Sequence, residues 1–272
     1  MSDPVHALTY ERRRLTGVRS TWLVPALVIP ASAAVAELTL RQPAFAAVGA
    51  PVDPVQVLTA GLPLLPLPVA ALGAGVIGAL SAGHEFRYPA PRALLRPLRR
   101  RLGLLLAKLV VVGLFAALLG AATLAVDALL LHFGDRSAAA PLEAAARHGQ
   151  LPVALGGYLA LVVAGSWIGL LGAALLRSAA AGVLVLITVP ILAEPVAGAL
   201  LDRSALESGG LRALRWHELF PVDGSHAWLY GALSGLRSGT AVSEAGLAAA
   251  VAAPVAVLLL AYLLLLPRRS AL

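Results

Sequence analysis

Six long apolar stretches, separated by shorter polar or basic segments, dominate this sequence. They cover residues 21–40, 58–82, 104–131, 151–176, 179–201 and 245–266. A helix needs about 20 mostly apolar residues to cross a hydrocarbon core of about 30 Å. Because backbone polar groups in lipid must be satisfied inside the spanning segment, such stretches are expected to be helical. The sequence therefore predicts an all-α integral membrane protein with six transmembrane helices.

Composition supports this class. Hydrophobic residues make up 59% of the 272 residues and charged residues 13%, with a mean hydropathy of +0.86, whereas a soluble domain is roughly 45 to 50% apolar. The chain has no cysteine, which excludes disulfides, thiolate metal sites and thiol catalysis. Residues 44–46 read AFA and could follow a cleaved signal peptide. The first apolar stretch has spanning length and five more follow, so we expect it to be a retained span.

The basic residues predict the topology. Fourteen of the 21 Lys and Arg residues fall on one side of the predicted spans and seven on the other. Short loops rich in Lys and Arg resist translocation, so the richer side is expected to be cytoplasmic, together with both termini. The net charge of +7 is thus interpreted as topology; no nucleic-acid-binding motif accompanies it. The strong preference for Arg over Lys, with abundant Ala, Leu, Gly and Pro, is typical of a bacterium with a GC-rich genome.

The segment before the first span predicts an amphipathic helix. Its apolar positions Leu8, Leu15 and Val18 recur near the helical period. The charged residues fall mostly elsewhere on the helix: Glu11, Arg12, Arg14 and Arg19. We expect residues 1–20 to lie on the cytoplasmic surface as an elbow helix and residues 21–272 to form one membrane domain. A simple basic anchor to anionic lipid is an alternative that is compatible with this interpretation.

The segment joining the second and third spans predicts a contact surface. Residues 83–108 read GHEFRYPAPRALLRPLRRRLGLLLAK, an acidic residue followed by arginines, prolines and leucines. The residues expected to contact a cytoplasmic partner are Glu85, Phe86, Arg87, Arg92, Leu95 and Arg96. The alternative is that the arginines serve only topology and lipid headgroup binding.

Two further segments carry structural expectations. Prolines Pro63, Pro66 and Pro68 open the second span, and we expect a helix that begins near Leu62, with only Pro68 as an interior kink; an unwound substrate path is the alternative. Residues 216–233 read WHELFPVDGSHAWLYGAL and are rich in amphipathic aromatics. Amphipathic aromatic residues prefer the headgroup layer of a membrane. We therefore predict interfacial or re-entrant helices between the last two spans.

Enzymatic and metal motifs are missing from the sequence. Its single lysine, Lys108, follows no glycine-rich phosphate-binding turn, and His217-Glu218 lacks a second histidine at position 221. No G-x-S-x-G motif occurs. These patterns predict no catalytic site, no metal site and no cofactor held by this chain.

Three acidic residues within the predicted spans are candidate functional groups, because charge is costly in lipid. Asp127 and Glu37 are expected near the outer headgroups and therefore solvated, since Asp127 is about 34 Å from the inner start of its span. Glu194, between Pro190 and Pro195, is a candidate for the translocation path or else a solvated carboxylate.

Three motifs together resemble the permease subunits of ABC-2 type exporters. They are YERRRLTGVRSTW before the first span, the segment 83–108, and LFPVDGSHAWLYG before the last span. The resemblance departs from the family at residues 89–93, where PAPRA replaces a Gly-Thr-hydroxyl pattern. The coupling helix of such a permease is therefore expected to begin after Pro91.

The resemblance implies a function and partners. It implies a dimer of permeases, homo- or heteromeric, in a bacterial plasma membrane, with cytoplasmic ATPase subunits that bind ATP and Mg and press on a coupling helix. The implied activity is export of an amphiphilic small molecule, drug, antibiotic or lipid. The alternative is an ATP-independent carrier, scaffold or sensor, although a carrier would be expected to show internal repeats and midplane charged pairs, and neither is found in the sequence. An embedded enzyme, the third class, would require a paired nucleophile and base.

Overall fold

The computed structural model describes residues 4–41, 57–60, 67–87, 98–134, 150–188 and 244–268. Within these ranges the chain is helical and has no strand. The seven helices of the described ranges are α1 (Pro4–Gly17), α2 (Arg19–Arg41), α4 (Val69–Arg87), α5 (Leu98–Gly134), α7 (Gln150–Leu176), α8 (Ala179–Thr188) and α11 (Glu244–Arg268).

Three of these helices contain segments long and apolar enough to cross a membrane. They are Arg19–Arg41, Leu102–Gly134 and Leu155–Leu176, with mean hydropathies of 1.8, 2.6 and 2.2. Shorter apolar helices cover Val69–Gly83, Ala179–Thr188 and Pro254–Leu265. These six segments fall within or overlap the six predicted spans. The all-helical prediction is confirmed for the described residues, and three of their helices have the length and composition of membrane spans. The number of six spans stays a prediction.

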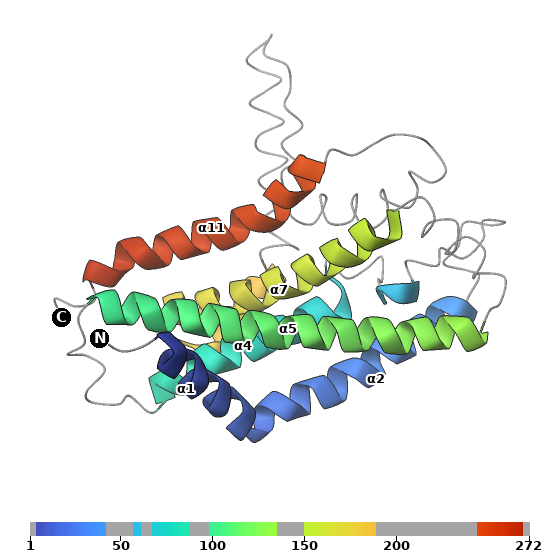
Figure 1. Ribbon diagram of the computed structural model, residues 1–272, viewed down its shortest axis with the longest axis horizontal. Coiled ribbons are helices and arrows are strands. Elements are labelled where there is room, and N and C mark those ends of the chain that lie inside the picture. The colour runs from blue at the N-terminus through green and yellow to red at the C-terminus, as the bar shows by residue number, and fades with distance from the viewer. Residues whose placement is uncertain are drawn as a thin grey trace, which may run out of the picture.

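Helices α2, α4, α5 and α7 alternate in direction along the chain (Figure 1). Figure 1 shows α2 and α5 running from left to right, while α4, α7 and α11 run from right to left. The start of α5 and the ends of α4, α7 and α11 therefore lie toward one end of the bundle, which α1 also approaches (Figure 1). This alternation is the one that successive membrane crossings require.

Helix α7 is the centre of the bundle. Of the residues in its most apolar 18-residue stretch, 61% are buried inside the protein, whereas 22% are buried in the corresponding stretch of α2. Its fully buried side chains include Tyr158, Leu170 and Leu171. Helices α4, α5, α8 and α11 all pack against it, so its composition is apolar around its whole circumference.

Glycines set the distance between α4 and α7. A Cβ atom added at Gly169 of α7 would overlap the carbonyl group of Gly75, and one added at Gly78 of α4 would overlap that of Ser166. A Cβ atom added at Gly165 would lie 2.8 Å from the Ala71 oxygen. The two backbones are thus in direct contact, the mode by which small residues allow close helix packing in membranes.

The first turn of α4 corrects one expectation. The helix begins at Val69, and the carbonyl of Pro68 accepts hydrogen bonds from the amides of Ala71 (2.9 Å) and Leu72 (3.1 Å). The prediction of a helix that begins near Leu62 with a kink at Pro68 is therefore wrong. A residue without an N–H and with a fixed φ fits the helix start, where no intrahelical donor is required. Pro63 and Pro66 lie outside the described residues.

Candidate functional site

Arginines gather at one end of the bundle, which we call the basic end. In the described ranges they occur in α1, at the start of α2 and α5, at the end of α4 and α11, and in the turn between α7 and α8: Arg12, Arg13, Arg14, Arg19, Arg87, Arg99, Arg100, Arg101, Arg177 and Arg268. Arg41, at the last residue of α2, lies toward the opposite end (Figure 1). The helix directions thus bring together the residues that the sequence assigned to one side.

The predicted contact segment lies partly within the described residues. Glu85, Phe86 and Arg87 form the last turn of α4 at the basic end. Arg92, Leu95 and Arg96 lie outside the described residues. The next helix, α5, begins at Leu98 rather than at 104 and has 37 residues, a length of about 55 Å. Its first turns, with Arg99 to Arg101, therefore precede the span.

Helix α1 is fixed to the bundle at a sharp corner. The chain leaves helical geometry at Val18 and resumes as α2. The Trp22 indole Nε1 donates to the Thr16 carbonyl at 2.9 Å, and its ring meets Phe115 of α5 edge to face, with centroids 5.8 Å apart. The corner thus joins α1, α2 and α5, and the Trp22 side chain provides the link.

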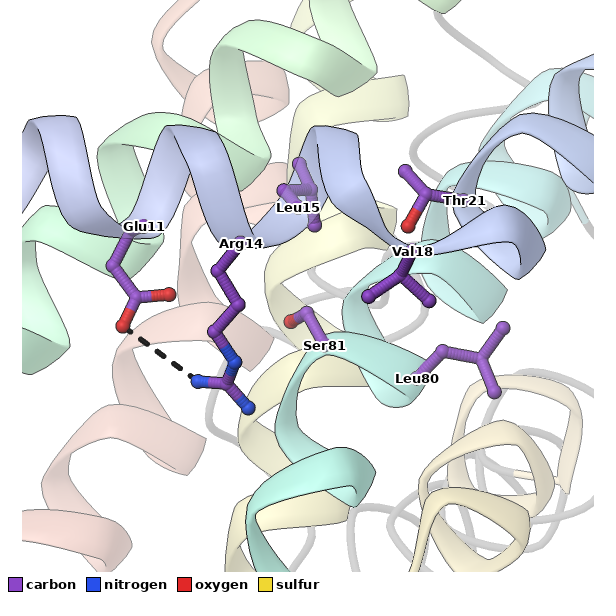
Figure 2. Close-up of a pocket in the computed structure, with 7 residues that line it drawn as sticks. All are labelled: Glu11, Arg14, Leu15, Val18, Thr21, Leu80 and Ser81. Carbon is purple, nitrogen blue, oxygen red and sulfur yellow. Dashed lines mark ion pairs between the residues drawn. The ribbon is translucent and has the colours of Figure 1, made fainter.

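A small pocket lies under α1. Figure 2 shows Glu11 and Arg14 of α1 beside it, with nitrogen and oxygen 3.7 Å apart. The other lining residues come from α1, the corner, α2 and α4: Leu15, Val18, Thr21, Leu80 and Ser81. The cavity, of about 20 Å³, has room for a water molecule.

The burial of Glu11 corrects the predicted amphipathic pattern. Glu11 is 6% exposed and lies one helical turn from the buried Leu15, whereas Arg12 and Arg19 are exposed. The sequence places Glu11 with the charged surface. Residues at i and i+4 share a helix face, and the structure shows that this face packs toward α5 and α4.

Four polar side chains form a ladder across α2, α5 and α7. The Ser32 hydroxyl donates to Asp127 Oδ2 at 2.6 Å. One turn earlier on α5, the Thr123 hydroxyl donates to the Gly120 carbonyl at 2.9 Å and is 3.0 Å from the Tyr158 hydroxyl of α7. We call Ser32, Asp127, Thr123 and Tyr158 the polar ladder; all four residues have 0% exposure.

Asp127 contradicts the expectation of a solvated carboxylate. It is fully buried, and its Oδ1 atom has no hydrogen-bond partner among the described residues. Asp127 lies seven residues before the end of α5, or about 10 Å. The sequence does not show which way its side chain faces, because burial depends on which helices flank α5. The i, i+4 spacing of Thr123 and Asp127 is the sequence signal that marks this polar face.

The other two acidic candidates differ from Asp127. Glu37 is partly exposed, as expected for its position, and forms an ion pair with Arg41 four residues later. Glu194 lies outside the described residues. Within the described ranges no group of three or more His, Cys, Asp or Glu residues is arranged to hold a metal ion.

Comparison of the chain with protein-family models, with curated proteins and with solved structures gives no match.

Proposed function

We propose that this chain is the membrane-spanning permease subunit of an ABC-2 type exporter, which moves an amphiphilic compound out of a bacterial cell. The observation that carries the proposal is the hairpin at the basic end. Helix α4 ends there with Glu85 to Arg87, α5 begins there with Arg99 to Arg101, and α1 packs against α5. A basic hairpin braced by a surface helix is suited to receive force from a cytoplasmic partner.

The mechanism follows from which helices are rigidly joined. Glycine packing binds α4 to α7, so these two helices move as one body. Helix α5 is a continuous rod, and a push on its first turns is transmitted to its far end, where the polar ladder ties it to α2 and α7. A partner that presses on Arg92, Leu95 and Arg96 would thus move α5 and, through the polar ladder, act on α2 and α7.

ATP binding belongs to another chain under this proposal. The sequence has no phosphate-binding loop, so a separate ATPase would hold ATP and Mg and contact the hairpin. Charged residues at such a contact specify the partner more than they strengthen the complex. A second copy of the permease, or a related one, would complete the pathway across the bilayer.

A second candidate is an ATP-independent carrier. The observation that favours it is the fully buried Asp127 in the polar ladder, because ionisable residues inside membrane helices often belong to ion or proton pathways. This candidate predicts transport without an ATPase.

The test is co-purification and ATP hydrolysis. The chain would be expressed with a candidate ABC ATPase subunit from the same genome, purified in mild detergent and reconstituted in vesicles. Under the proposal, Arg96→Glu lowers ATPase recovery and transport at least about tenfold, the effect of about 1.4 kcal/mol at the contact. Arg41→Gln, at the opposite end of α2, is the control and leaves both unchanged. Transport that continues without any ATPase would replace the proposal with the carrier.

A further inference from the structure

The Asp127 side chain is a buried acid whose bonding is incomplete. Its Oδ2 atom accepts from Ser32, while Oδ1 has no partner in the described parts of the chain. A buried carboxylate charge is costly unless a cation or several donors compensate it. With one hydroxyl donor, Asp127 accepts fewer hydrogen bonds than a buried carboxylate ordinarily does.

Among the residues that the structure describes, no opposite charge reaches Asp127 from the helices around it. On α2 the charged residues nearest in sequence to Ser32 are Glu37 and Arg41, and they pair with each other. From α7 the titratable group is Tyr158, whose hydroxyl is bonded to Thr123.

The other neighbours within the described ranges add no charge. The buried turn 57–60 packs near the same end and reads Val-Leu-Thr-Ala. On α5 itself the nearest titratable side chain is His132, which is exposed.

The packing limits what could bind to Oδ1. Every member of the polar ladder has 0% exposure, and interiors packed to this degree leave little free volume. A cationic cargo group needs a cavity, and a metal ion needs several ligands. A proton needs neither.

We propose that Asp127 is a proton-binding site that locks α2 to α5. With the proton on Oδ1 the acid is neutral, and Oδ2 keeps its bond from Ser32. When α2 and α5 separate at the end opposite the basic end, water reaches the carboxyl group, the proton passes from Oδ1 to that water, and the carboxylate is hydrated. The packed arrangement is thus favoured by proton binding and the separated arrangement by proton release.

The lock is independent of which motor moves α5. Any movement that separates α2 from α5 must break the Ser32–Asp127 bond, whether an ATPase or another force drives it. The inference can therefore be tested on the purified chain alone, and its failure would leave the proposed exporter function untouched.

The experiment uses the absence of cysteine in the native sequence. Spin labels are attached at Leu38→Cys on α2 and Leu129→Cys on α5, two exposed positions (52% and 56%) near the same end. The distance between the labels is measured in nanodiscs between roughly pH 5 and pH 9, a range that lies above ordinary carboxyl titration and below tyrosine titration. Infrared spectra of the unlabelled chain record the carbonyl stretch of protonated carboxyl groups over the same range.

The proposal predicts that the labels move apart as the pH rises, while the protonated-carboxyl band disappears in parallel. Asp127→Asn, which is neutral at every pH, abolishes both changes. The matched control Glu37→Gln, which removes the exposed carboxylate of α2, retains both. A label distance that is independent of pH in the native chain, or that changes equally in Asp127→Asn, overturns the proposal. If Asp127→Asn does not fold, the infrared spectrum decides: a native chain with no protonated-carboxyl band at about pH 6, where exposed acids are ionised, also overturns it.

Discussion

Replacing Gly169 by alanine tests the close packing of α4 and α7. The new Cβ would lie 2.8 Å from the carbonyl carbon and 3.0 Å from the Cα of Gly75, in addition to overlapping the carbonyl oxygen. Carbon atoms pack best at about 3.5–4.0 Å. The obstructing atoms belong to backbone, so no side chain can rotate away. The two helices must separate locally by roughly 1 Å.

The expected cost follows from two opposing effects. Overpacking of this kind costs about 1–3 kcal/mol, and a gap of about 1 Å along the neighbouring contacts loses up to half of their dispersion energy. Alanine regains about 0.5–1 kcal/mol of helix propensity relative to glycine. The net destabilisation of Gly169→Ala is therefore about 1–2 kcal/mol.

The matched control is Gly156→Ala on the same helix, where an added Cβ meets no atom within 4 Å. This variant should be unchanged or slightly more stable, by up to about 1 kcal/mol. Stability is measured by detergent-induced unfolding of the chain in mixed micelles, followed by circular dichroism. Equal unfolding midpoints for the two variants would refute the direct backbone contact between α4 and α7.

Two further substitutions test the polar ladder and the α1–α2 corner. Tyr158→Phe removes the hydroxyl that meets Thr123, but Thr123 keeps its bond to Gly120. The free energy of unfolding should therefore fall by only about 1 kcal/mol. A loss above about 3 kcal/mol would mean that the hydroxyl has another role. Trp22→Phe keeps an aromatic ring beside Phe115 but removes the indole donor to Thr16. Limited trypsin digestion should then cleave α1 faster than in the native chain. An unchanged cleavage rate would show that the indole hydrogen bond does not hold the corner.

The predictions that hold are those set by composition and charge along the chain. Apolar length predicts helices because lipid leaves backbone groups no other partner, and the arginines fall at one end because alternate helices reverse direction. Hydropathy wrongly predicts Pro68 inside a helix, because it does not separate the first turn of a helix from the residues before it. The position of Glu194 and of the segment with Arg92, Leu95 and Arg96 stays a prediction.

The sequence by itself determined that this protein is helical, apolar and divided into one basic and one less basic side. Only the tertiary structure decided that Asp127 is dry, that Glu11 faces inward and that α4 touches α7 through glycine. The physical reason is that hydropathy and charge are properties of single segments, whereas burial and contact depend on which helix faces are brought together by packing.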